Sequence, residues 1–507
     1  MKKIAICIVF ICIVSLSTFA QQINGEILSD TSNITVVKVW GSHQERGFAY
    51  GYLLGNGIKD LYTSYIVPQF GSFIPTAKQY ISQGDHISID TIFHQEAQAM
   101  IDGMDSAGVD LSGMDYLDIL IANSFLDLYS LSIMKNIDSL GCSSLMSWGD
   151  ATVGTNLNGK SVISRHLDWT PDNSIIANQV IVIHIPSEPN EQAWLLVGFA
   201  GQMSVLSGLN ESGVSAFQHM MSDFTGSALM NQAYEPIWFS LRKGLEMRDL
   251  NNDGFENVGD IRQALEINSN GYAEGFIVAS MSPSNASHDS LVAMVAELAP
   301  ASPKLVFRSN SYSDSIPGDN LYAANSEIKR NDHLNYCSRY YSVINGIADG
   351  SDISAEQNWQ IMSDYSNSGY GNIQFMQHIP EQQILHLAVH DGNSGAYLNS
   401  KKAYDLNELF SAPISIEEND LVVSDFKIFP NPANDNLNLF FNLKKKQTVN
   451  IYIYNSNGKL INENYEMKLE PGKYSYSISL EGLKNGVYFC SLNTIDSIIY
   501  RKVIICK

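Results

Sequence analysis

From Lys427 to the end, the chain alternates apolar and polar side chains with a period of two, and this pattern limits its fold more than any other feature. The runs NLNLFFNL, TVNIYIYN, YSYSISL and GVYFCSL each place every second side chain on one face, as a half-buried β-strand does. Asn457-Gly458, Pro471-Gly472 and Asn485-Gly486 separate the runs and favour tight turns. The pattern predicts a small all-β antiparallel sandwich over residues 425–507.

The chain before this region has a different pattern. Residues 21–412 interleave strand-like and helix-like segments, which is typical of an α+β fold. The pattern changes within the stretch SAPISIEENDLVVSDF. We therefore expect residues 413–424 to form a linker between two domains.

The first residues, MKKIAICIVFICIVSLSTFA, are typical of a secretory signal peptide, predicted here over residues 1–20. Two lysines precede an apolar run from Ile4 to Val14, and a small residue, Ala20, lies at the expected cleavage point. A membrane anchor would need roughly 20 apolar residues, and this run is shorter. The pattern therefore predicts export through the periplasm, and we expect no transmembrane segment elsewhere.

The chain carries a net charge of −22, with 31 basic and 53 acidic residues, and removal of the signal peptide would take two further lysines away. Binding to nucleic acid requires clustered Lys and Arg side chains. We therefore expect no nucleic-acid partner and a protein that works outside the cell.

Six cysteines are present, and Cys7 and Cys12 lie within the predicted signal peptide. The remaining four, Cys142, Cys337, Cys490 and Cys506, are too few for a disulfide framework in so long a chain, and no pair has CxxC spacing. At least one of them therefore has another expected role.

Cys142 follows Gly141 at the start of the strand-like run SSLMSW. A free thiol has a pKa near 8.5 and is a weak nucleophile at neutral pH. If the Gly141–Cys142 bond is cut, Cys142 gains an α-amino group with a pKa of about 8, which can act as its general base. The other interpretation of Cys142 is a buried structural thiol.

The segment GCSSLMSWGD…SVISRHLDW resembles the region around the nucleophile of the N-terminal nucleophile (Ntn) cysteine hydrolases. It looks most like the acyl-coenzyme A:6-aminopenicillanic acid acyltransferase-like family, whose relatives include choloylglycine hydrolases and acid ceramidase-type amidases. GSHQERGFAYG, at residues 41–51, also resembles an element of the family prosegment. The resemblance implies a four-layer αββα sandwich, with residues 21–141 as the prosegment and 142–412 as the catalytic chain.

The resemblance also implies roles for individual residues. Arg165 and Asp168 in SRHLDW match the family Arg-x-x-Asp, in which the arginine lowers the thiol pKa and the aspartate holds the α-amino group. Asn210 in GLNESG and Asn325 in LYAANSE match the oxyanion donors, and Arg339 in CSRYYSV completes the site. Residues three apart on a regular strand face opposite ways, so the Arg-x-x-Asp role requires a bend.

These residues also have ordinary structural interpretations. Arg165 and Asp168 could form an ion pair, and Asn210 could be a turn residue. His166 and His219 are expected to be packing or network residues. The resemblance implies a secreted, self-processing hydrolase that cleaves a linear amide bond of a small N-acyl substrate through a Cys142 acyl-enzyme, with no cofactor for catalysis. An acyltransferase, a phospholipase B-like hydrolase and a non-catalytic surface-binding protein remain alternatives.

A second motif lies between two helix-like stretches, at residues 249–260. Asp249, Asn251, Asp253 and Asp260 fall at positions 1, 3, 5 and 12 of an EF-hand loop, with a glycine at position 6. Phe255 would offer its backbone carbonyl. The final Asp in place of Glu resembles the dockerin variant, but the sequence has one loop where a dockerin has two. The motif predicts a structural Ca²⁺ site, with a solvated turn as the alternative.

The C-terminal strands contain FKIFPNPANDNLNL, IYNSNGKLI and LKNGVYFCSL. They resemble the C-terminal sorting domain of type IX secretion cargo. The resemblance implies the type IX secretion machinery as a partner, and a protein that is secreted or attached to the cell surface. The alternative is an ordinary carbohydrate-binding or spacer sandwich.

Overall fold

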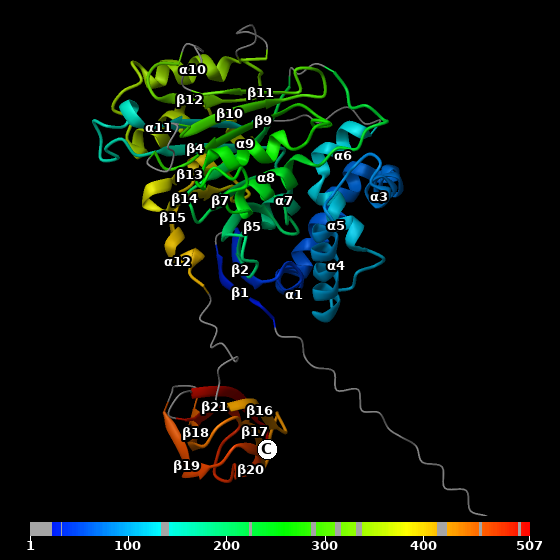
Figure 1. Ribbon diagram of the computed structural model, residues 1–507, viewed down its shortest axis with the longest axis vertical. Helices are drawn as coiled ribbons and strands as arrows, with labels where there is room; N and C mark the ends of the chain where they lie inside the picture. The colour runs from blue at the N-terminus through cyan, green and yellow to red at the C-terminus, as the bar shows by residue number, and fades with distance from the viewer. Residues whose placement is uncertain are drawn as a thin grey trace, which may run out of the picture. The chain divides into compact units, whose positions relative to one another are not determined.

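The computed structural model describes residues 23–31, 33–132, 141–222, 226–284, 291–309, 316–330, 337–412, 423–455, 459–494 and 498–507. The chain divides into two compact units, which we call the large unit (Met1–Ser411) and the tail unit (Ala412–Lys507) (Figure 1). The predicted signal peptide lies outside the described residues, as do residues 413–422 of the predicted linker.

Two β-sheets form the middle of the large unit. As far as the chain is described, sheet 1 has nine strands and sheet 2 has six. In sheet 1 the order is β1 (Gly25–Thr31), β2 (Ile34–Gly41), β5 (Gln179–Pro186), β6 (Trp194–Phe199), β7 (Ser207–Asn210), β8 (Ser215–Met220), β9 (Phe276–Met281), β10 (Ala293–Leu298) and β11 (Leu305–Arg308). In sheet 2 it is β12 (Asn320–Ala323), β3 (Ser143–Ser147), β4 (Val162–Asp168), β13 (Asn372–Ile379), β14 (Ile384–Val389) and β15 (Lys402–Asp405).

The two sheets pack face to face around one apolar core. Strand β5 shows the arrangement, because Ile181 and Ile183 join a cluster that also contains Ile163 and Met376 of sheet 2. The alternate residues of β5, such as Val182, join a separate cluster with the helices. Successive side chains of a strand point to opposite faces, so a strand apolar on both faces is covered on both.

Helices cover the outer face of each sheet. Apolar side chains on the outer face of sheet 1 pack in one cluster with α1 (His43–Leu61), α4 (Thr91–Ser106), α5 (Tyr116–Asn123), α6 (Phe125–Leu131), α8 (Ile237–Glu246) and α9 (Val258–Glu266). On sheet 2, Leu145 and Phe375 pack with α10 (Ser338–Ile347) and α11 (Ala355–Tyr365). Other α-helices of the described chain are α2 (Val67–Phe70), α3 (Ile74–Gln83), α7 (Asn173–Ala177) and α12 (Leu406–Phe410). The predicted αββα order of layers is confirmed.

Three glycines allow α1 and α4 to pack with their backbones in contact. A Cβ atom added at Gly51 would lie 1.9 Å from the Met100 carbonyl oxygen, and one at Gly103 would lie 2.1 Å from the Phe48 oxygen. At Gly47 the same atom would lie 2.4 Å from the Glu96 oxygen. Two of these glycines belong to the GSHQERGFAYG element. Only glycine fits at these three positions, so the spacing of the glycines determines how closely the two helices pack.

The tail unit is a sandwich of two antiparallel sheets, as its alternating pattern predicts. One sheet has the order β16 (Val423–Phe429), β17 (Asn436–Leu443) and β20 (Gly472–Ser479). The other has the order β19 (Leu460–Leu469), β18 (Gln447–Asn455), β21 (Gly486–Asn493) and β22 (Ile498–Ile505). Leu437, Leu439 and Phe441 on β17 alternate toward a core that they share with Ile451 and Ile453 on β18.

Candidate active site around Cys142

Cys142 lies directly before β3, a strand in the interior of sheet 2. Strand β3 pairs with β12 on one side and with β4 on the other. The cysteine is only 5% exposed and its thiol is free. Its position at the start of an interior strand brings side chains from the ends of both neighbouring strands close to the Gly141–Cys142 bond.

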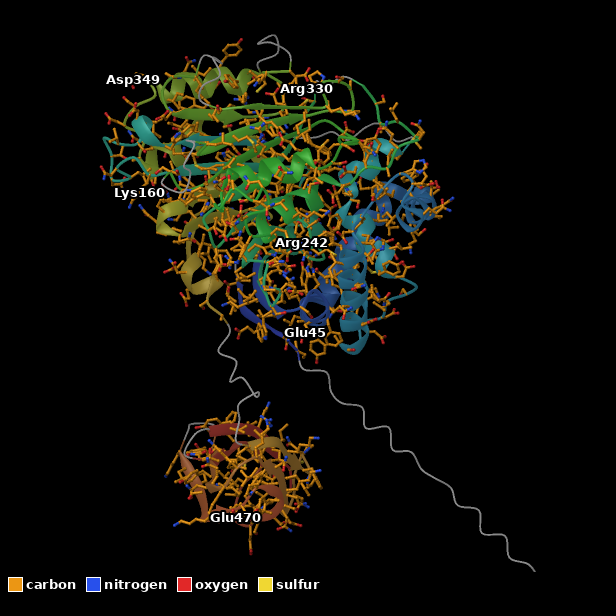
Figure 2. All side chains as sticks on the ribbon, in the orientation of Figure 1. Glu45, Lys160, Arg242, Arg330, Asp349 and Glu470 are labelled. Carbon is orange, nitrogen blue, oxygen red and sulfur yellow. The ribbon has the colours of Figure 1, made fainter. Side chains whose placement is uncertain are left out.

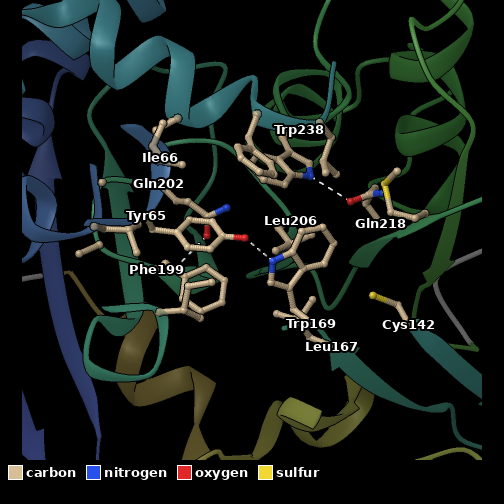
Figure 3. Close-up of a pocket in the computed structure, with 18 residues that line it drawn as sticks. Tyr65, Ile66, Cys142, Leu167, Trp169, Phe199, Gln202, Leu206, Gln218 and Trp238 are labelled. Carbon is tan, nitrogen blue, oxygen red and sulfur yellow. Dashed lines mark hydrogen bonds between the residues drawn. The ribbon is translucent and has the colours of Figure 1, made fainter. Parts of the chain in front are cut away.

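Cys142 forms part of the wall of an apolar cavity that is partly open to solvent. Figure 3 shows the cysteine at the edge of this set of side chains. The polar groups of the wall bond to each other, since the Trp238 indole donates to Gln218 at 3.1 Å and the Trp169 indole donates to Tyr65. Other apolar side chains of the wall are Leu61, Ile66, Phe125, Leu126, Leu167, Ile175, Phe199, Leu206 and Met220. Such a lining suits an apolar group.

Arg165 lies on β4 and is fully buried beside the thiol. Its Nη2 donates to the Gln218 carbonyl at 2.7 Å, while Nε and Nη1 have no hydrogen-bond partner among the described residues. Burial lowers the pKa of this guanidinium, and the neighbouring Cys142 and Asp168 oppose that shift. A buried cation with two unpaired donors stabilises an anion that forms nearby.

Asp168, the last residue of β4, reaches the same site because the strand pairing is irregular there. The register between β4 and β13 shifts between Asn372 and Gln374. A shift of this kind turns a side chain toward another face, which supplies the bend that the Arg-x-x-Asp spacing requires. The Asp168 carboxylate accepts hydrogen bonds from Ser368 at 2.6 Å and from Asn372 at 2.8 Å. Burial raises the pKa of Asp168 to about 6.

Arg339 joins the residues on both sides of the Gly141–Cys142 bond. Its Nη1 donates to the Gly141 carbonyl at 2.9 Å and lies 3.4 Å from Asp168, and its Nη2 donates to Asn325 at 2.5 Å. The Asn325 amide in turn donates to the Met220 carbonyl at 2.6 Å. A Cβ atom at position 141 would lie 2.0 Å from Arg339, so this arrangement requires glycine there.

The thiol itself is not activated in the intact chain. Burial raises the pKa of Cys142, and Arg165 and Arg339 oppose the rise with their positive charge, while Asp168 adds to it. The thiol therefore stays protonated at neutral pH until a base takes its proton.

The structure does not bring Asn210 into this cluster. The residue ends β7, where its amide donates to the Leu245 carbonyl at 3.1 Å and its oxygen accepts from the Val214 amide at 2.8 Å. Both bonds hold the β7–β8 turn and tie it to α8. The geometry therefore favours the turn interpretation of this asparagine.

The two histidines near the site bond to neighbouring groups. The His166 ring contacts the Met362 carbonyl at 3.1 Å and stacks on Phe375, and burial lowers the pKa of His166 to about 3. The His219 ring contacts the Ser144 hydroxyl at 3.0 Å, and burial also lowers its pKa. Both rings are neutral network residues.

Sequence reasoning did not find Ser368 or Asn372, the two residues that hold Asp168. Both lie far from their partner along the chain, with separations of 200 and 204 residues. A serine and an asparagine beside a Gly-Tyr-Gly turn carry no distinctive sequence signal. Only the pairing of β4 with β13 brings them to the aspartate.

The predicted calcium loop connects α8 and α9. Asp249 accepts hydrogen bonds from the backbone amides of Asp253 and Gly254, at 2.9 Å and 3.2 Å. Asp260 accepts from the Asn251 amide at 3.2 Å, and burial raises the pKa of Asp260 to about 6. The loop thus gathers oxygen ligands around a turn at Gly254, whose φ is +87°. These are ligand atoms of the kind that Ca²⁺ prefers.

A buried ion cluster lies in the helical layer. Figure 2 places one member, Arg242, among the packed side chains of the large unit. Arg242 bonds to Glu96 at 2.7 Å and to Glu246 at 2.8 Å, and His43 bonds to Glu96 and Glu191 at 2.6 Å and 2.9 Å. Arg46 bonds to Glu246 and Glu191 as well. His43, Glu191 and Glu246 could also surround a metal ion, but Arg46, Arg242 and a protonated His43 already balance the charge of the three glutamates.

Comparison with known proteins gives similarities to part of the chain. The chain is 21% identical over 242 residues to protein dcd1B of Dictyostelium discoideum, covering 45% of this chain and 46% of that protein, so it spans about half the length of this curated relative. An N-acylethanolamine-hydrolyzing acid amidase ortholog from Caenorhabditis elegans overlaps 47% of this chain and 93% of its own, at 13% identity and a TM-score of 0.34. A conjugated bile acid hydrolase variant from Clostridium perfringens overlaps 53% and 93%, at 13% identity and a TM-score of 0.35.

None of the helices in the described ranges has the length and apolar character needed to cross a bilayer.

The tail unit matches a known family directly. Residues 427–506 match the family described as a secretion system C-terminal sorting domain. The predicted sorting tail is therefore confirmed, and this chain carries the signal of an exported protein.

Proposed function

We propose that the large unit is an exported, self-processing hydrolase that cleaves the linear amide bond of a substrate with an apolar acyl group. The observation that carries this proposal is the position of Cys142, whose thiol borders the apolar cavity and whose preceding carbonyl is held by Arg339. Hydrolysis of the Gly141–Cys142 bond would make Cys142 the first residue of a new chain. The type IX secretion machinery would carry the protein outward and recognise its tail.

The position of Gly141 indicates where a substrate carbonyl would bind. In the intact chain Gly141 supplies the acyl side of the bond next to the thiol, and a substrate's acyl carbonyl would occupy the same place after cleavage. Arg339 then donates to the oxygen that gains charge when the thiolate attacks, and the Asn325 side-chain oxygen accepts from Arg339 and holds it there. Loss of one such donor typically costs about 3 kcal/mol of transition-state stabilisation.

The new α-amino group of Cys142 would take the thiol proton and return it to the leaving amine. Its pKa of about 8 suits both steps. Arg165 would stabilise the thiolate, and Asp168 would orient the amine. Water would then release the acyl group. The cavity favours an acyl group without charge, because burying a charge among apolar side chains is costly.

The test combines mass and activity. Intact-mass analysis of the exported protein should give two fragments, the second beginning at Cys142, and a thiol reagent should label that residue. A panel of N-acyl amides with acyl chains of increasing length should show turnover that Cys142→Ala abolishes and Cys337→Ala preserves. A single uncut chain with an unreactive thiol would refute the proposal and leave a non-catalytic binding protein.

We further propose that the 249–260 loop binds Ca²⁺ as a structural clip, through Asp249, Asn251, Asp253, Asp260 and the Phe255 carbonyl. The support is the ordered placement of these groups between α8 and α9. The ion would take no part in amide cleavage.

A further inference from the structure

Ser368 lies between the bond to be cut and the aspartate of the site. Its hydroxyl is 2.6 Å from the Asp168 carboxylate and 3.5 Å from the Gly141 carbonyl oxygen. The position is fixed by its neighbours, because the following turn bonds to Trp169 through the Gly371 carbonyl at 2.9 Å and Asn372 also holds Asp168.

We propose that Ser368 is a catalytic hydrogen-bond donor for self-cleavage at the Gly141–Cys142 bond, acting on the Gly141 carbonyl together with Arg339. The inference rests on the proposed function, since it concerns the maturation step that creates the nucleophile. It adds a second donor on the reacting oxygen, from the turn before β13, beside the guanidinium from α10.

The single hydroxyl proton explains how the donor is switched on. While Asp168 is ionised, the Ser368 proton faces the nearer carboxylate. When Asp168 takes the Cys142 thiol proton, its carboxyl group donates to the Ser368 oxygen, and the hydroxyl proton turns to Gly141. Arg165 and Arg339 are the charged groups that face Asp168. Loss of the thiol proton and stabilisation of the oxyanion are thereby coupled.

The step balances without any outside redox partner. The Cys142 sulfur bonds to the Gly141 carbonyl carbon, and the carbonyl electron pair moves to oxygen, where Ser368 and Arg339 stabilise it. The carbon–nitrogen bond then breaks, and the nitrogen receives the proton that the thiol gave up. Water hydrolyses the resulting thioester to a Gly141 carboxylate and a free Cys142 thiol. The 3.5 Å contact is long in the ground state, and such contacts shorten when the oxygen gains charge.

The experiment measures the rate of chain cleavage. The full-length protein is made by cell-free translation, and the uncut and cut forms are quantified over time by intact mass. Ser368→Ala should slow cleavage at least about tenfold, since loss of one well-aligned oxyanion donor typically costs about 10²–10³ in rate. The control is Ser366→Ala on the same segment, whose hydroxyl bonds to Tyr322 and Ser143 and contacts neither Gly141 nor Asp168; it should stay within about twofold of wild type.

A second pair of variants covers loss of folding. Ser368→Thr and Ser368→Val have nearly the same shape, and the threonine form should cleave about tenfold faster. Equal rates in this pair, or a wild-type rate in a folded Ser368→Ala protein, would overturn the role of Ser368. Absence of cleavage in the wild-type chain would instead refute the proposed function, so the two failures can be told apart.

Discussion

The buried ion cluster makes a prediction about pH that follows from one histidine. His43 is 4% exposed. Burial alone would lower its pKa, but hydrogen bonds to Glu191 and Glu96 raise the pKa of His43 to about 9. The unfolded chain has the ordinary value near 6.5. Folding therefore favours the protonated ring.

The sign and size of the effect follow from this difference. A raised folded-state pKa gives stability that is fully present below pH 6.5 and is lost as the pH rises toward 9. Each pKa unit is worth about 1.4 kcal/mol, so the free energy of unfolding should fall by about 3 kcal/mol over this range. Arg46 and Arg242 stay charged throughout and continue to pair with the three glutamates.

Urea denaturation between pH 6.5 and 9.5 measures this change. All six tryptophans, at positions 40, 148, 169, 194, 238 and 359, lie in the large unit, so their fluorescence reports its unfolding alone. The Cys142→Ala background keeps the chain uncut and the reaction unimolecular. His43→Gln should remove the pH-dependent fall of about 3 kcal/mol. His86→Gln, whose ring contacts Asp85 and stacks on Tyr80, serves as the control and should preserve it.

A wild-type protein and a His43→Gln variant with the same pH slope would refute this reasoning. So would a stability that stays constant between pH 7 and 9, because a histidine held neutral by burial changes the free energy of unfolding only below about pH 6.5.

Three further predictions concern the calcium loop, the turn asparagine and the cavity. Added Ca²⁺ at 100 times its Kd should stabilise the large unit by about 2.7 kcal/mol in calorimetry; Asp249→Asn should abolish the effect, and an unchanged melting temperature in wild type would exclude the site. Asn210→Ala should lower the free energy of unfolding by about 1–3 kcal/mol, because it removes two buried hydrogen bonds. Its kcat should stay within about twofold, whereas a loss of about 10²-fold would restore the oxyanion role. Leu206→Trp replaces an aliphatic side chain of the cavity wall with a larger indole ring. The kcat/KM for long-chain N-acyl amides should then fall at least about tenfold relative to short-chain ones. Equal losses for both would show that acyl chains bind elsewhere.

The sequence predicted the features that depend on local periodicity. The tail strands alternate with a period of two and fold as alternating strands, because one face of each must be buried. The glycines of α1 were visible as a pattern, although their purpose is clear only from the contact with α4. Cys142 could be nominated as a candidate nucleophile because it follows a glycine and because its segment resembles that of a known family.

The neighbours of that cysteine depended on tertiary structure. The sequence nominated Arg165, Asp168, Asn325 and Arg339, and the fold brings them around the Gly141–Cys142 bond. It nominated Asn210 as well, and the fold uses that side chain to hold a turn.

The sequence by itself determined that the tail folds as alternating strands and that it is the sorting tail, and it nominated the thiol that we propose becomes a chain terminus. Only the tertiary structure decided that Asp168 turns toward the thiol, that Ser368 and Asn372 hold it, and that the thiol borders an apolar cavity. The reason is that these contacts depend on the order and register of strands distant in the chain, and hydrogen bonds across such pairings leave no periodic trace in the sequence.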